Sequence, residues 1–220
     1  MLLAKIYKAG IIVDIPNSSV DKAVKRIRAL VDGGIRLIGI DMRQAEAFQI
    51  VERCAAQFPD QVAVKAQYVL DSASARKSLL AGADIVSTPY LIKEVLTVCN
   101  RYGKICIPGA LTATEVLQAI EWGADLVMIY PADLFGPGLL KALNGPLPQA
   151  RLVPSAGVTS ENMAAWFRAG AWAVMVDDLF REVKVKDSTV SDDILAMYAR
   201  KLTHCFANTA ASLPSRSWAQ

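Results

Sequence analysis

Histidine is nearly absent from this chain of 220 residues: His204 is the single one, and it lies far along the sequence from every expected strand end. A zinc site built on several histidine ligands is therefore excluded. The four cysteines, Cys54, Cys99, Cys106 and Cys205, form no CxxC pair and fall within helix or strand patterns. We interpret them as reduced residues of the core.

Concentrated charge and long apolar runs are also missing. The formal net charge of +3 comes from scattered lysines and arginines, with no basic run and no aromatic residues interleaved with one. No stretch approaches the roughly 18 uninterrupted apolar residues of a membrane span, and the opening MLLAKIYKAG has no cleavage-site pattern. We expect neither nucleic acid nor a membrane as partner, and a soluble, cytoplasmic protein.

A repeated design is present instead. Four segments, VDGGIRLIGID, LAGADIVST, EWGADLVMIYP and RAGAWAVMVDD, place a glycine after a helix pattern and just before a short apolar run. This is typical of a helix C-cap that leads into a strand. The four glycines, Gly34, Gly82, Gly123 and Gly170, lie 48, 41 and 47 residues apart, which leaves room for one more strand between successive members.

The intervening strands are found in VAVKAQYV, GKICIPG and ARLVPSAG, and AGIIVDI supplies the first. Eight apolar strands alternating with helices predict an α/β fold, a (β/α)8 TIM barrel, formed by a single domain over 1–220 with a last helix at about 187–211. An open doubly wound sheet is the structural alternative, but no GxGxxG follows the first strand.

The active site of such a barrel lies at the C-terminal ends of its strands. The residues expected there are Asp14, Asp41, Arg43, Lys65, Gln67, Tyr68, Thr88, Pro108, Tyr130, Ser155, Asp177 and Asp178. Because side chains alternate along a strand, Lys65 and Gln67 share one face, and polar groups are poorly tolerated against the helix layer. We therefore expect Lys65 to point into the barrel.

A buried lysine needs a partner or gives up its proton. One interpretation of Lys65 is a structural ion pair with Asp41 or Asp14. Another is an amine made nucleophilic by burial and by Arg43, acting as a Schiff-base nucleophile or as a base. In a third, Lys65 binds a ligand anion without covalent chemistry.

From residue 9 to about 180 the chain resembles a known family. The matching stretches are ALVDGGIRLIGIDMR, IPGALTATEV, YPADLFGPGLLKALNGPLP and PSAGVTSENMAAWFRAGA, in the family's order and spacing. The family is that of the 2-keto-3-deoxy-6-phosphogluconate and 4-hydroxy-2-oxoglutarate aldolases. The resemblance implies a class I aldolase, a lyase that acts on a 2-oxo acid, and we expect no cofactor.

The resemblance also implies roles for particular residues and an assembly. Arg43 matches the arginine that binds the pyruvate carboxylate, Ser155 stands where a threonine assists it, and Pro131 and Gly157 belong to the matching loop motifs. The family is trimeric. We expect a homotrimer, with the apolar helix faces around IVERCAAQF and LIKEVLTV as a candidate interface.

Several motif positions of the family are occupied differently here. Met128 stands at the position of the Schiff-base lysine in MIYPA, and Gly39 at that of the proton-shuttling glutamate in GIDMR. Lys65 and Tyr68 take a glycine and a threonine position. The family's phosphate-binding loops correspond here to PSAG and to VDD. The carboxylates of Asp177 and Asp178 in VDD repel a phosphate. Because Gly39 has no side chain, Lys65 can fill the space that the glutamate side chain occupies in the family.

Three functional hypotheses follow. The first is a lyase in which Lys65 supplies the amine and Tyr130 or Tyr68 serves as acid or base, with Arg43, Asp41, Gln67, Ser155, Pro131 and Gly157 around the substrate. The second is a non-catalytic or differently catalytic barrel that binds a small anion. The third is a metal-dependent enzyme that holds Mg²⁺ or Mn²⁺ between Asp14, Asp41 and Asp177.

Overall fold

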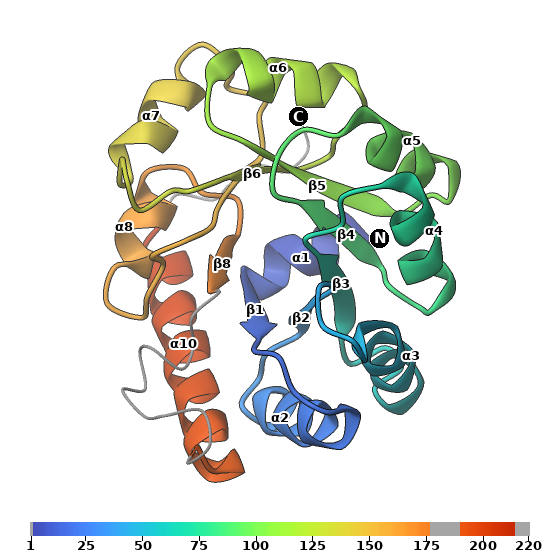
Figure 1. Ribbon diagram of the computed structural model, residues 1–220. Coiled ribbons are helices and arrows are strands. Elements are labelled where there is room, and N and C mark those ends of the chain that lie inside the picture. The colour runs from blue at the N-terminus through green and yellow to red at the C-terminus, as the bar shows by residue number, and fades with distance from the viewer. Residues whose placement is uncertain (1, 177–189, 214–220) are drawn as a thin grey trace.

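The protein folds into a (β/α)8 barrel, as predicted. The structure is a computed structural model that describes residues 2–176 and 190–213. Eight parallel strands form the inner wall and the helices lie outside it (Figure 1). The strands are β1 (Ile11–Ile15), β2 (Leu37–Asp41), β3 (Ala63–Gln67), β4 (Ile85–Thr88), β5 (Ile105–Ala110), β6 (Val127–Ile129), β7 (Leu152–Pro154) and β8 (Val174–Val176).

The strands follow one another around the barrel in chain order. The hydrogen-bonded order is β7-β6-β5-β4-β3-β2-β1-β8, so β1 pairs with both β2 and β8. Between the two end strands the backbone N–H of Trp172 donates to the carbonyl of Leu152 at 2.8 Å. The sheet thus nearly closes on itself, and all strand C-termini lie at one end of the barrel, the mouth.

Helices connect and cover the strands. They are α1 (Leu2–Ala9), α2 (Val20–Asp32), α3 (Ala47–Gln57), α4 (Ser72–Leu80), α5 (Lys93–Arg101), α6 (Ala113–Glu121), α7 (Gly138–Asn144), α8 (Met163–Arg168) and α10 (Asp192–Ser212). The four glycines predicted to end helices have φ values of 96° (Gly34), 107° (Gly82), 90° (Gly123) and 102° (Gly170), a region that disfavours side chains. The predicted caps are confirmed.

Helix α1 was not expected from the sequence. It lies across the end of the barrel opposite the mouth (Figure 1), and its Ile6 is completely buried against the apolar layer inside the barrel. That layer includes Ile12, Leu37, Ile85 and Ile105. Since α1 closes the base, a ligand of the barrel interior has to enter from the mouth.

The C-terminal helix α10 packs against α2 and α8 on the outside of the barrel. The hydroxyl of Thr203 donates to the carbonyl of Gly33 at 3.2 Å, which ties the helix to the end of α2. The helix begins at Asp192; positions 187–189 of the expected helix lie outside the described residues. All four cysteines are free, and those at 54, 99 and 106 are buried.

The helices predicted to form the subunit interface use most of their apolar side chains to cover the barrel. The large apolar side chains of α3, Ile50, Val51 and Cys54, are buried, while its Glu52 and Arg53 are exposed. In α5, Val95, Leu96 and Cys99 are buried in the same way, and Val98 is half-buried. The interface itself stays a prediction.

Among residues 2–176 and 190–213, none of the helices combines the length and the apolar character needed to cross a bilayer.

The packing of α1 gives a first prediction. Replacing Ile6→Ala should lower the free energy of unfolding by about 2–5 kcal/mol, because it opens a cavity at the base of the barrel. Urea denaturation measures this. Lys8→Ala on the exposed side of the same helix is the control, with a change within about 0.5 kcal/mol. Equal effects of the two variants would contradict the role of α1 as the closure of the base.

Candidate functional site

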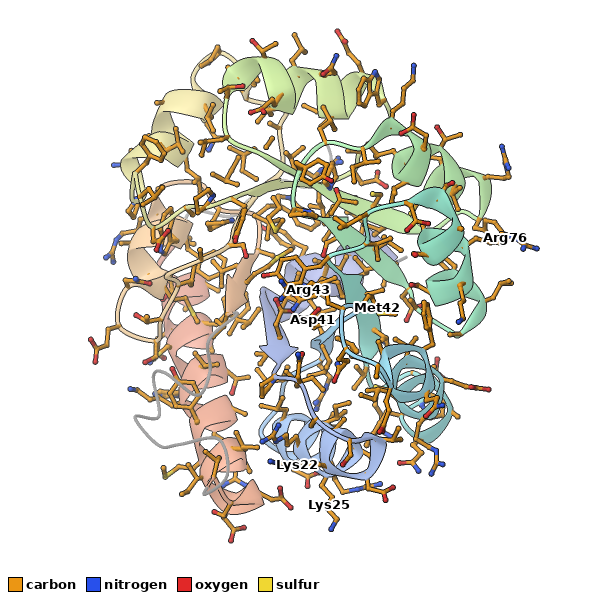
Figure 2. All side chains as sticks on the ribbon, in the orientation of Figure 1. Lys22, Lys25, Asp41, Met42, Arg43 and Arg76 are labelled. Carbon is orange, nitrogen blue, oxygen red and sulfur yellow. The ribbon has the colours of Figure 1, made fainter. Side chains whose placement is uncertain are left out.

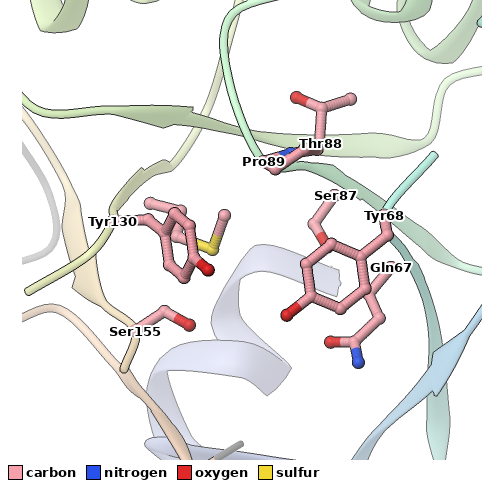
Figure 3. Close-up of a pocket in the computed structure, with 8 residues that line it drawn as sticks. Gln67, Tyr68, Ser87, Thr88, Pro89, Tyr130 and Ser155 are labelled. Carbon is pink, nitrogen blue, oxygen red and sulfur yellow. The ribbon is translucent and has the colours of Figure 1, made fainter. Parts of the chain in front are cut away.

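A small pocket lies at the mouth, where barrels of this kind carry their active sites. Figure 3 shows its lining side chains, with the rings of Tyr68 and Tyr130 on opposite sides. The lining residues are Gln67, Tyr68, Ser87, Thr88, Pro89, Met128, Tyr130 and Ser155. The cavity volume is about 10 Å³, which corresponds to one water molecule. A larger ligand requires one of the two tyrosine rings to move.

Below the pocket a charged pair crosses the inside of the barrel. The strand register aligns Asp14 of β1, Gly39 of β2 and Lys65 of β3 in one row. The Lys65 Nζ lies 2.8 Å from one carboxylate oxygen of Asp14 and 3.0 Å from the other. Only 1% of Lys65 and 4% of Asp14 is exposed. Lys65 therefore points into the barrel as predicted, and Asp14 is its partner.

Gly39 makes this pair possible. A Cβ atom at position 39 would overlap an Asp14 carboxylate oxygen and come within 2.7 Å of the Lys65 Cε. The side chain of Lys65 on β3 thus passes over Gly39 on β2 and reaches Asp14 on β1. Its Nζ also contacts the Met175 Sδ at 3.5 Å. The sequence-based expectation that Lys65 fills the space above Gly39 agrees with this geometry.

At the rim of the pocket, Arg43 is bound to Asp41 and to Tyr68. The Arg43 Nε donates to both Asp41 oxygens at 2.9 and 3.2 Å, and Nη2 donates to one of them at 2.6 Å. The backbone N–H of Arg43 adds a bond to Asp41 at 2.9 Å. Figure 2 shows the two residues together at the end of β2. The guanidinium lies 3.9 Å from the centre of the Tyr68 ring.

This arrangement keeps Arg43 charged and Tyr68 in place. The hydrogen bond that Arg43 donates to Asp41 is the largest cause that raises the pKa of Arg43 above its usual value. Tyr68 has a φ of 59°, an unfavourable backbone conformation for an aromatic residue that costs about 1–3 kcal/mol. The cation–π contact with Arg43 offsets part of that cost. Arg43 remains accessible, since 61% of its side chain is exposed.

The structure brings most of the predicted site residues together. Gln67, Tyr68, Tyr130 and Ser155 line the pocket, and Thr88 lies beside them with its hydroxyl donating to the carbonyl of Tyr90 at 2.6 Å. Lys65 and Asp14 lie beneath this lining and are not part of it. Pro131 follows Tyr130 through a cis peptide bond, and Gly157 lies two residues after Ser155 with a φ of 72°.

Of the three remaining predicted positions, the structure describes one. Pro108 lies within β5 and does not line the pocket. Asp177 and Asp178 lie outside the described residues. Sequence reasoning missed Ser87 and Pro89. Ser87 could have been found from the alternation of side chains along β4, because Ile85 two residues earlier faces the barrel interior.

Two of the three residues proposed as metal ligands are engaged otherwise, and the third, Asp177, lies outside the described residues. Asp14 is paired with Lys65, and Asp41 is paired with Arg43. Within 2–176 and 190–213, no group of three or more histidine, cysteine, aspartate or glutamate residues is placed to hold a metal ion. Two cations that are already paired with the carboxylates compete with any metal for the same oxygens.

The fold and the position of this pocket define a TIM-barrel protein with its site at the C-terminal ends of the strands. A model of the KDPG and KHG aldolase family matches residues 3–197. The chain belongs to this aldolase family.

Individual relatives agree with this assignment. A 2-dehydro-3-deoxy-6-phosphogalactonate aldolase of Escherichia coli K12 is 32% identical over 163 residues, which cover 73% of this chain and 80% of the relative. A KHG/KDPG aldolase of the same organism is 27% identical over 167 residues, 72% and 78% of the two chains.

Solved structures resemble the fold closely. A native KDPGal structure superposes with a TM-score of 0.83 at 25% identity, covering 91% of this chain and 96% of the other. A KDPG aldolase from Legionella pneumophila, solved with pyruvate captured as a covalent carbinolamine, gives a TM-score of 0.82 at 22% identity, covering 91% and 97%.

The buried ion pair gives the second prediction. Lys65→Met should lower the free energy of unfolding by about 3–5 kcal/mol, because it leaves Asp14 buried without its counter-charge. Adding Asp14→Leu should recover a large part of this loss. Thermal and urea unfolding of both variants check it.

Lys104→Met is the matched control, because the ion pair of Lys104 with Asp84 is about one third exposed. Removing that pair should cost no more than about 1 kcal/mol. If Lys65→Met and Lys104→Met had similar effects, the internal pair would not be the structural element described here.

Proposed function

We propose that this member of the aldolase family binds a small 2-oxo acid at the mouth of its barrel, and that Lys65 does not form an imine with it. Family membership supports an aldolase-like lyase acting on a 2-oxo acid. The observation that speaks against an imine at Lys65 is its position. Lys65 is buried beneath the pocket, with its Nζ within 3.0 Å of both carboxylate oxygens of Asp14.

A lysine in this state is poorly suited to nucleophilic attack. An ammonium that donates to a carboxylate has no free lone pair with which to attack a carbonyl carbon. The space beside it is filled, because Asp14 and the lysine side chain itself occupy the volume above Gly39. Met128, which the family resemblance puts at the position of the Schiff-base lysine, lines the pocket and has no amine.

The rim of the pocket supports carboxylate binding. Among the described residues, the hydrogen bonds of the Arg43 guanidinium run from Nε and Nη2 to Asp41, which leaves the second N–H of Nη2 and both N–H groups of Nη1 for a ligand. A guanidinium N–H that donates to a carboxylate forms a strong, charge-assisted hydrogen bond. Ser155 and Tyr130 lie across the pocket from Tyr68 (Figure 3), and their hydroxyls can donate to a 2-oxo group.

A lyase that uses Lys65 is the second candidate. Its support is the short distance along β3 between Lys65 and the pocket. Gln67, two residues after Lys65 on the same strand, is one of the lining residues. The Asp14 carboxylate could accept the proton that the ammonium has to lose, and Tyr130 or Tyr68 would then act on the substrate as acid or base. In this case pyruvate and borohydride should label Lys65, and Lys65→Met should abolish the label.

A substitution in the pocket tests the proposal directly. Met128→Lys places an amine among the apolar and hydroxyl groups of the pocket, where burial favours its neutral form. Pyruvate with borohydride should then add the mass of a reduced pyruvate at position 128, as seen by peptide mapping. The wild-type protein should gain no such mass, although pyruvate should raise its melting temperature.

Met163→Lys is the control for this experiment, since Met163 is buried in the layer between barrel and helices and not in the pocket. It should not be labelled. An adduct at Lys65 of the wild-type protein would reject the proposal in favour of the second candidate. Failure of pyruvate to change the melting temperature would reject 2-oxo acid binding itself.

Assembly as a homotrimer and a cytoplasmic location remain predictions. A designed cage, built by fusing symmetric oligomeric domains, has a TM-score of 0.84 to this chain at 25% identity over 92% of it, which supports self-association. Exposed apolar side chains at the mouth, Leu70, Tyr90, Leu134 and Phe135, could contribute to an interface. Light scattering should give three times the 23.8 kDa chain mass, and a monomer mass at micromolar concentration would contradict the prediction.

A further inference from the structure

In the described part of the chain, two pairs of oppositely charged side chains lie next to the mouth pocket. All eight lining side chains are uncharged. Directly beneath them the charge of Lys65 is balanced by Asp14, and at the rim the charge of Arg43 is balanced by Asp41. Within the described part of the chain, a ligand therefore meets a mouth with no net positive charge, although a carboxylate can still bond to Arg43.

We propose that this site selects 2-oxo acids with a single negative charge and an uncharged tail, and that Asp41 is the residue that sets this selectivity. The inference rests on the proposed function, because it concerns the ligand class of the same site. A first carboxylate can bond to Nη1 of Arg43. A second anionic group, whether a carboxylate or a phosphate, finds no counter-charge among the described residues that line the pocket.

Asp41 acts through two effects. Its buried carboxylate takes the Nε–H and one N–H of Nη2, so a ligand carboxylate can bond only to the remaining N–H groups of Nη1 and Nη2. Its negative charge also cancels the attraction that Arg43 would otherwise exert on every anionic group of a ligand at the mouth. For two charges about 7 Å apart, Coulomb's law with an effective dielectric constant of about 20 to 80 gives an effect of roughly threefold to fiftyfold on affinity.

The contact of Arg43 with Tyr68 makes this arrangement stable. Since the guanidinium lies 3.9 Å from the ring centre, a rotation of Arg43 toward a ligand would cost the cation–π contact as well as the bonds to Asp41. The ring of Tyr68 lines the same pocket. Asp41 therefore positions Arg43, and Arg43 positions one wall of the pocket.

The test compares two ligands that differ in charge and hardly in shape. 2-Oxoglutarate carries two carboxylates, whereas in 2-oxoglutaramate the distal carboxylate is an uncharged amide. Titration calorimetry on the full chain should give at least about threefold tighter binding of the amide. Asp41→Asn, which keeps the size and one acceptor oxygen, should reduce that ratio at least about threefold and strengthen the binding of both ligands.

Asp60→Asn is the matched control. It removes one negative charge at the opposite end of the barrel, and asparagine tolerates the φ of 62° found at Asp60. This variant should keep the wild-type ratio. Circular dichroism should show that both variants are folded. Raising the salt concentration should weaken the effect of Asp41→Asn on the ratio, because salt screens the unbalanced charge of Arg43 in that variant.

The outcomes separate the two proposals. If wild-type protein binds pyruvate but binds 2-oxoglutarate as tightly as the amide, the charge selectivity is wrong and the proposed function stands. If Asp41→Asn leaves the ratio unchanged, or Asp60→Asn changes it equally, the assignment to Asp41 is wrong. If the wild-type protein binds neither pyruvate nor either probe, the proposed function fails and the selectivity fails with it.

Discussion

The ion pair between Lys65 and Asp14 is the constraint on which the interior of this barrel depends. Two charges that are almost completely buried are tolerated only when they neutralise each other at short distance, as they do here at 2.8 Å. The pair spans β1 to β3 and requires a glycine on the strand between them. The identity of one strand residue thus depends on two others that lie far from it in the sequence.

The pair also determines what the mouth can do. Because Asp14 binds the ammonium of Lys65, neither group is free for a ligand, and chemistry is left to the uncharged residues above them and to Arg43 at the rim. Arg43 in turn is held by Asp41, so that the second cation is also balanced. A barrel of the aldolase family thereby presents a pocket with matched charges, lined by hydroxyl, amide and aromatic groups.

The small volume of the pocket reflects how its walls are fixed. Tyr68 adopts a left-handed backbone conformation at the end of β3 and is held by the Arg43 guanidinium. Tyr130 stands across from it (Figure 3), just before a proline. Helix α1 covers the base of the barrel, so the pocket described here lies at the opposite end. Ligand binding is therefore coupled to the position of an aromatic ring.

The sequence by itself determined the barrel and the direction of its interior side chains. Glycines such as Gly34 and Gly82 mark helix ends through a backbone conformation that other residues avoid, and strand alternation directs Lys65 inward, so both signals are local. The tertiary structure alone decided which of two aspartates pairs with Lys65, that Arg43 stacks on Tyr68, and that α1 closes the base. These contacts join residues on different strands, so they depend on strand register and side-chain packing, which local sequence patterns do not contain.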